Sequence, residues 1–282
     1  MKVTKTVFTV VTPVSQIITA DGRMVSQVLF GTIGTVAEIK SGKMLVQCSP
    51  GPRTIAGYIR RRDCVLNSRR PIKTNRVVVV ARTPATNLLT QPRYNAPIAQ
   101  PAFLGSVFSY TGRDRTGPDG DFFEVYLNRT NTAWAPKEYV LLRSTSESFP
   151  VATSGREVVQ FVQEHLIGDP YQWGGVTSNG WDCSGLTMIA AKVFGVTLPR
   201  NSMWQWESEI GRCIGPRGPF KAGDFLYFRK INGPWNHCGI TDGRGNLIHA
   251  EGVRECKVTQ WPIGEVTAKK KLNLLGAKRL WQ

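Results

Sequence analysis

One cysteine, Cys183, stands at the point where a helix is predicted to begin. Asp182 before it is a favourable N-cap residue, and the apolar run Leu186–Phe194 predicts a helix that Gly195 ends. In the first turn of a helix, free backbone N–H groups and the helix dipole favour a thiolate and can receive an oxyanion. These are the surroundings of a nucleophilic cysteine. A lone cysteine is more often a small buried apolar residue, so the interpretation needs a nearby base.

Two of the three histidines of the chain lie on either side of the segment Asp242-Gly243-Arg244-Gly245-Asn246. Turn residues between two apolar runs predict a β-hairpin. A loop centred on Gly243 would place His237 and His249 directly opposite each other on one face of the sheet. One imidazole can then accept the thiol proton of Cys183 while the other orients it. Taken alone, the pair is equally consistent with ordinary surface histidines.

A series of short motifs contains these residues and follows one order along the chain: Pro170-Tyr171-Gln172-Trp173-Gly174-Gly175, Asp182-Cys183-Ser184-Gly185-Leu186, Leu198-Pro199-Arg200-Asn201-Ser202, Gly223-Asp224-Phe225-Leu226-Tyr227-Phe228, His237-Cys238-Gly239-Ile240 and Ile248-His249-Ala250. In their residue types and order the motifs resemble the NlpC-type cysteine peptidases, papain-like enzymes of cell-wall peptidoglycan, over about Gly155 to Trp261. At Cys238 the family usually has an aliphatic residue, and a small apolar thiol fits that position.

The resemblance implies an α+β papain-like catalytic domain in residues 155–282 and a thiol protease that uses no cofactor or metal. Cys183 would be the nucleophile, His237 the base that takes its proton, and His249 the residue that orients His237. Tyr171 resembles the active-site tyrosine of the family. It would help the backbone N–H groups of the helix start to hold the oxyanion.

The resemblance also implies a substrate, peptidoglycan or its stem-peptide fragments. The bond that is cut would lie between D-glutamate, linked through its γ-carboxyl, and the diamino acid that follows. Asp182 and Ser184 would bind the free amine of a short stem, and Arg200 and Ser202 its carboxylate. A surface ion pair is the alternative interpretation of Arg200. The sequence does not identify the third residue of the stem.

Residues 1–143 contain short runs rich in Val, Ile, Phe and Thr between Gly, Pro and Asn, a pattern typical of small β-barrels. They resemble two small all-β bacterial SH3-like barrels, at 1–75 and 76–143; a single larger β-domain is the alternative. A linker at 144–154 would follow, and Ser154 with Glu157 predicts a capping box. The predicted strands are Lys2–Val11, Val25–Phe30, Gly34–Ile39, Met44–Gln47, Ile55–Ile59, Arg76–Ala81, Ala102–Tyr110, Phe122–Leu127, Trp134–Pro136 and Tyr139–Leu142.

The composition is strongly basic, with 36 Lys and Arg against 20 Asp and Glu and a formal net charge of +16. Such a charge attracts polyanions of any kind. No helix-turn-helix, zinc-finger or RNA-binding aromatic motif accompanies it. An anionic cell-wall surface is therefore favoured over a specific nucleic acid as the partner.

Location and cysteine chemistry are less strongly indicated. No apolar run is long enough for a transmembrane helix, and no signal-peptide core is visible, but the implied substrate predicts an extracellular or cell-surface protein. The cysteines show no zinc-type spacing. Cys48 and Cys64 flank a predicted hairpin and could form a disulfide, whereas Cys213 and Cys256 are interpreted as core residues.

Three other functions stay open beside a peptidoglycan endopeptidase. A cell-wall amidase of related fold would cut between sugar and stem. A non-catalytic cell-wall-binding protein would combine the barrels with a relic peptidase domain, but the intact Cys183, His237 and His249 argue against decay. A nucleic-acid binder is supported only by the charge. The oligomeric state is not predicted.

Overall fold

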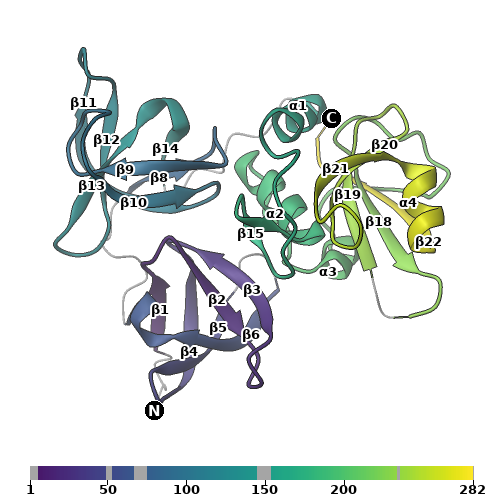
Figure 1. Cartoon of the computed structure of the whole chain (residues 1–282), viewed down its shortest axis with the longest axis horizontal. Coiled ribbons are helices and arrows are strands. Elements are labelled where there is room, and N and C mark those ends of the chain that lie inside the picture. The colour runs from purple at the N-terminus through teal and green to yellow at the C-terminus, as the bar shows by residue number, and fades with distance from the viewer. Residues whose placement is uncertain (1–5, 49–52, 67–74, 145–153, 234–235, 282) are drawn as a thin grey trace. The chain divides into compact units, whose positions relative to one another are not determined.

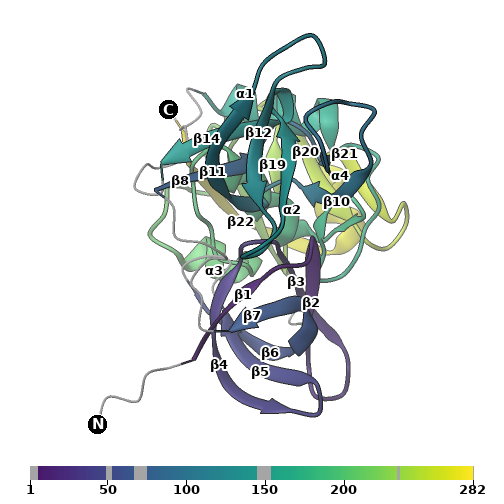
Figure 2. The same cartoon turned by 90° about the vertical axis from the view of Figure 1, so that its left-hand side faces the viewer.

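The computed structural model describes residues 6–48, 53–66, 75–144, 154–233 and 236–281 of the 282-residue chain. The chain divides into two compact units, Met1–Pro50 with Thr54–Glu147 and Gly51–Arg53 with Ser148–Gln282. Strands build the first unit, and helices around a sheet build the second (Figure 1, Figure 2). Among the described residues, no helix has the length and apolarity needed to cross a membrane.

Two seven-stranded antiparallel sheets make up the first unit, and their strand orders match. The orders are β3-β2-β6-β5-β4-β1-β7 and β10-β9-β13-β12-β11-β8-β14, so each strand of the second corresponds to one seven places earlier. The first sheet contains β1 (Val7–Val10), β2 (Val14–Ile18), β3 (Met24–Leu29), β4 (Ile33–Lys40), β5 (Lys43–Cys48), β6 (Ile55–Arg60) and β7 (Cys64–Leu66). The second contains β8 (Arg76–Val80), β9 (Ala85–Leu89), β10 (Ile98–Phe103), β11 (Val107–Arg115), β12 (Phe122–Tyr126), β13 (Thr132–Pro136) and β14 (Val140–Ser144).

The repeated strand order confirms the all-β prediction for this part of the chain and supports two similar modules over one larger domain. The modules touch within the unit, because the rings of Phe30 and Phe108 stack with their centroids 4.3 Å apart. The assignment to SH3-like barrels and the limits 1–75 and 76–143 stay predictions. Residues 145–153 of the predicted linker lie outside the described residues.

The predicted single strand Ala102–Tyr110 is wrong, because a turn divides it into β10 and β11. Gly105 adopts a φ of +83° and donates its N–H to Val80 O at 2.8 Å, while Leu104 donates to Pro84 O at 2.9 Å. Leu104 is fully buried, so the apolar run continues through the turn. Apolar sequence indicates burial but not chain direction, and for that reason the turn could not be recognised from the pattern.

The second unit is a six-stranded antiparallel sheet with helices on both faces, ordered β17-β22-β18-β19-β20-β21. Helices α2 and α3 pack on β18–β20 from one face, and α4 packs on the other, as Figure 1 shows. The elements are α1 (Gly155–His165), β15 (Val176–Thr177), β16 (Gly180–Trp181), α2 (Cys183–Val193), α3 (Ser202–Glu207), β17 (Arg212–Ile214), β18 (Phe225–Lys230), β19 (Asn236–Thr241), β20 (Asn246–Glu251), β21 (Lys257–Pro262), α4 (Ile263–Lys270) and β22 (Leu272–Arg279). The predicted α+β fold is confirmed.

Side chains of the central strand β18 point alternately to the two faces of this sheet, and each face packs against different helices. Leu226 and Phe228 pack against Val266 of α4. Tyr227 points the other way, and its hydroxyl donates to Gln205 Oε1 of α3 at 3.3 Å. Successive side chains of a strand face opposite sides, so one apolar segment fills both halves of the core.

Three smaller predictions are corrected by the structure. Ser154 occupies the N-cap of α1, but its side chain makes no capping hydrogen bond in the described part of the chain, so the capping box is absent. Cys48 and Cys64 are buried free thiols, and burial raises the pKa of each to about 12. Cys213 and Cys256 are exposed rather than in the core.

Candidate active site

Cys183 is the first residue of α2, as the sequence predicts. Asp182 is the N-cap, and its Oδ1 accepts the Gly185 N–H at 2.6 Å while Oδ2 accepts the Gly174 N–H at 2.9 Å. The helix start lies directly on the Gly-rich loop: a Cβ on Gly185 would stand 2.1 Å from Gly175 O. Glycine is required there for this close approach, and the approach fixes the position of Cys183.

Arg200 closes the other side of the Asp182 carboxylate. Its two terminal nitrogens donate to Oδ1 at 2.9 Å and Oδ2 at 2.6 Å, and one of them also donates to Ser184 Oγ at 2.9 Å. The Arg200 residue is 4% exposed. Burial works against the guanidinium charge, but the Asp182 carboxylate raises the pKa of Arg200 overall. This bidentate ion pair joins the helix start to the segment that leads into α3.

The two hairpin histidines meet, although not by the predicted register. The strands pair Ile240 with Ile248 and Thr241 with Leu247, so His237 and His249 are offset along the ladder rather than directly opposite. They share one face, and His237 Nε2 lies 2.9 Å from His249 Nδ1. The prediction of direct opposition is therefore wrong, whereas the predicted contact between the rings is present.

The register differs because the loop is not centred on Gly243. Gly243 and Gly245 both adopt positive φ, at +73° and +94°. Asp242 follows the last residue of β19. Its Oδ1 accepts the N–H groups of Arg244 at 2.7 Å and Asn246 at 3.1 Å. This side-chain cap moves the centre of the loop to Arg244.

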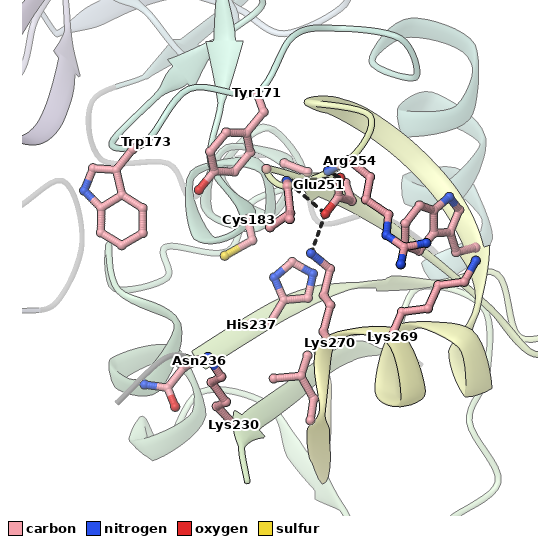
Figure 3. Close-up of a pocket in the computed structure, with 15 residues that line it drawn as sticks. Tyr171, Trp173, Cys183, Lys230, Asn236, His237, Glu251, Arg254, Lys269 and Lys270 are labelled. Carbon is pink, nitrogen blue, oxygen red and sulfur yellow. Dashed lines mark hydrogen bonds and ion pairs between the residues drawn. The ribbon is translucent and has the colours of Figure 1, made fainter. Parts of the chain in front are cut away.

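The surroundings of His249 fix its protonation. The ring is fully buried, and burial first, then the neighbouring His237 and Lys270, lowers the pKa of His249 to about 2. A neutral His249 with an unprotonated Nδ1 accepts the Nε2–H of His237. Because Nε2 of His237 is used in that contact, its Nδ1 is the ring nitrogen that can interact with Cys183. Figure 3 shows the Cys183 sulfur next to the His237 ring.

Cys183 carries the thiolate of this site. Hydrogen bonds from Cys238 and His237, working against burial, hold the pKa of Cys183 well below its usual value. The Cys238 thiol is fully buried, lies 3.6 Å from Thr187 Oγ1, and has its own pKa raised by burial and by Cys183. The second thiol therefore stays protonated and donates to the first. The sequence motif contained Cys238 but gave no sign of this contact.

A pocket of about 510 Å³ opens beside Cys183 and His237. Tyr171 lines it, with its hydroxyl near the Cys183 sulfur in the view of Figure 3. Burial and the Cys183 and Asp182 charges raise the pKa of Tyr171, so its hydroxyl stays protonated as a donor. A Cβ on Gly252 would stand 2.6 Å from this ring, so the glycine makes room for the tyrosine.

Glu251 holds one wall of the pocket and was missed by the sequence analysis. Its carboxylate accepts the N–H groups of Val253, Arg254 and Glu255, and Lys270 Nζ at 2.6 Å. These hydrogen bonds outweigh burial and lower the pKa of Glu251 to about 2. The signal that could have found it is its position two residues after His249, on the same face of β20.

The four residues predicted to bind substrate do not line this pocket. Asp182, Ser184 and Arg200 bond one another, and Ser202 is buried at the start of α3, after the N-cap Asn201. Both terminal nitrogens of Arg200 donate to the Asp182 carboxylate. Their substrate roles stay predictions.

A thiolate at a helix start, beside a histidine oriented by a second ring, is the geometry of a cysteine peptidase. Residues 168–273 match the model of the NlpC/P60 family. These residues form an NlpC/P60 domain. The resemblance seen in the sequence is thereby confirmed.

Curated relatives of the chain are peptidases or hydrolases by name. A gamma-D-glutamyl-L-lysine dipeptidyl-peptidase of Bacillus cereus is 27% identical over 241 residues, 83% of this chain and 69% of the relative. A gamma-DL-glutamyl hydrolase of Bacillus subtilis is 37% identical over 124 residues, 43% of this chain and 29% of the relative. A probable endopeptidase of Corynebacterium glutamicum is 35% identical over 118 residues, 41% and 53%. The chain thus spans only about half or less of the latter two relatives.

Solved structures agree on the fold. The crystal structure of an NlpC/P60 family protein from Bacillus cereus has a TM-score of 0.81 at 19% identity, covering 98% of this chain and all of that chain. An NlpC/P60 endopeptidase from Photobacterium damselae has a TM-score of 0.61 at 15% identity, covering 96% and 70%. The likeness extends over the strand-built unit as well as the NlpC/P60 domain.

The buried ion pair predicts a large loss of stability in Arg200→Met. The variant leaves the Asp182 carboxylate buried without its cation, which costs about 3–5 kcal/mol. Urea unfolding would measure the loss. Arg244→Met, at an exposed arginine of the same unit, is the control and should stay within about 0.5 kcal/mol of the wild type. Equal stability of the two variants would show that the pair does not hold the helix start.

The Cys183–Cys238 contact predicts a shift in thiol reactivity. Cys238→Val removes the donor that favours the thiolate, so the pKa of Cys183 rises and alkylation by iodoacetamide needs higher pH. Cys238→Ser keeps a donor at the same position and should titrate close to the wild type. Mass spectrometry of the peptide that contains Cys183 follows the reaction, with the exposed Cys213 as internal reference. A midpoint unchanged in Cys238→Val would contradict the assignment.

Proposed function

We propose that this protein is a peptidoglycan hydrolase, a cysteine endopeptidase that cleaves the stem peptide between γ-D-glutamate and a diamino acid. The observation that carries the proposal is the Cys183 thiolate beside His237, at the edge of an open pocket. The names of two relatives, a gamma-D-glutamyl-L-lysine dipeptidyl-peptidase and a gamma-DL-glutamyl hydrolase, support the choice of substrate.

In the proposed reaction the Cys183 sulfur attacks the γ-carbonyl carbon of D-glutamate. The carbonyl oxygen becomes an oxyanion, which the backbone N–H groups of the α2 start and the Tyr171 hydroxyl stabilise. His237 carries the thiol proton and delivers it to the leaving amine. Water then attacks the thioester, giving its proton to His237, and the thiolate is restored.

His249 orients His237 in this scheme and takes no proton itself. Its lowered pKa of about 2 keeps it neutral, so its Nδ1 remains an acceptor while His237 is an imidazolium. An acceptor at 2.9 Å from Nε2 stabilises that charge and fixes the ring plane. The second histidine thus has the role that an asparagine or aspartate has in other cysteine and serine peptidases.

We further propose that the protein acts at the cell wall, outside the cell or on its surface. The net charge of +16 supports adhesion to an anionic wall, and the two β-modules before the NlpC/P60 domain are candidates for that contact. The modules are proposed to be SH3-like.

The first test is digestion of purified peptidoglycan and of free stem peptides, with the products identified by mass spectrometry. The wild type should release new termini between γ-D-glutamate and the diamino acid. Cys183→Ala removes the nucleophile and should lower the rate by at least about a thousandfold. Cys213→Ala, at an exposed cysteine outside the pocket, is the matched control and should cleave normally.

Three other results would each reject the proposal in a different way. New termini between sugar and stem would indicate an amidase. Unchanged pelleting of both proteins with cell walls, without products, would indicate a binding protein. Products that persist in Cys183→Ala would place the chemistry at another residue.

A further inference from the structure

The pocket beside Cys183 and His237 is lined by more positive than negative side chains. Lys230, Arg254, Lys269 and Lys270 all line it, and among the described lining residues the only carboxylate is Glu251. A concave site with an excess of one charge concentrates ligands of the opposite charge. The reaction itself uses none of these four cations.

Two of the four cations have carboxylate partners. Lys270 pairs with the buried Glu251, and this pair belongs to the pocket wall. Lys269 pairs with the half-exposed Glu265 on the same helix and lies 4.8 Å from the ring centre of Trp261. An exposed pair one helical turn apart is weak, so Lys269 can still serve a ligand.

Arg254 is placed to bind an anion. No ion pair of its guanidinium is found among the described residues, and its side chain is exposed to the pocket. Its backbone is held in place, because the Arg254 N–H donates to Glu251 Oε2 at 2.6 Å. In Figure 3, the side chains of Arg254 and Lys269 lie on the opposite side of Glu251 from Cys183. A guanidinium presents two parallel N–H groups, which fit a carboxylate.

The position of these cations indicates which part of the substrate they meet, given the proposed function. The leaving amine must take its proton from His237, so the diamino acid lies on the His237 side of the nucleophile. Figure 3 shows Lys269, Lys270 and Arg254 beyond that ring, whereas Trp173 is on the other side of Cys183. The side chain of the diamino acid therefore extends toward the cations.

We propose that Arg254, with Lys269, binds a carboxylate on the side chain of the diamino acid and selects stems whose third residue carries one. Lysine has only an ammonium group at that place, which gains nothing from the Arg254 guanidinium and meets the excess of positive charge in this part of the pocket. Meso-diaminopimelate has a carboxylate beside its side-chain amine. This specificity rests on the proposed function, and it differs from the L-lysine in the name of the Bacillus cereus relative.

The test compares two purified tripeptides that differ only in that carboxylate, L-Ala-γ-D-Glu-meso-diaminopimelate and L-Ala-γ-D-Glu-L-Lys. For the wild type, kcat/KM should be at least about tenfold higher for the diaminopimelate peptide, as expected for a charge-assisted hydrogen bond. Arg254→Gln should bring the ratio close to one. Lys230→Gln, at a pocket cation near Asn236 in Figure 3, is the control and should keep the wild-type ratio.

Each other outcome has a distinct meaning. Cleavage of neither peptide overturns the proposed function and the specificity with it. Equal cleavage of both by the wild type overturns the specificity alone. An Arg254→Gln variant that loses activity on both peptides in equal proportion would show that Arg254 binds a group the two share. Loss of the ratio in Lys230→Gln but not in Arg254→Gln would assign the selection to Lys230.

Discussion

The carboxylate of Asp182 is the interaction on which the active site depends. It accepts N–H groups from the Gly-rich loop at Gly174 and from α2 at Gly185, and it forms the bidentate pair with Arg200. One buried group thus joins the Gly-rich loop, the start of α2 and the segment that leads into α3. Because Cys183 is the next residue, the position of its sulfur follows from how well this carboxylate is satisfied. The Ser184 hydroxyl is a fifth donor to this carboxylate. A buried charge is stable only when its donors remain in place.

The sequence allowed the chemistry to be predicted better than the geometry. The helix start at Cys183 and the pairing of two histidines follow from local signals, namely an N-cap, an apolar run and turn residues. The register of His237 and His249 was wrong because the hydrogen bonds of the Asp242 side chain, not the position of a glycine, set the centre of the loop. The predicted pairing was shifted by two residues along the strand. Because side chains alternate between the two faces, a shift of two keeps both rings on one face, and their contact remained.

Residues that act through long-range contacts could not be found from the sequence. The role of Arg200 was expected to be substrate binding, but its distance from Asp182 in the sequence hid the ion pair. Glu251 was missed although it follows His249 by two residues, because its partners, the backbone N–H groups of the next loop and Lys270 of α4, are set by the fold. In the strand-built unit, the sequence pattern predicted the all-β fold class. The matching strand order of its two sheets depends on which strands pair, and only the structure shows that.

The neutral His249 has a consequence for survival of the fold in acid surroundings. In the unfolded chain this ring takes up a proton near its ordinary pKa of 6.5, but in the folded protein only near 2. Glu251 behaves likewise, between 4.5 and about 2. In that range the unfolded state binds more protons, so the free energy of unfolding falls as the pH falls. Acidification therefore favours the unfolded chain, which binds these protons more readily, and lowers the stability of the folded domain. This loss is separate from any effect of pH on the Cys183 thiolate.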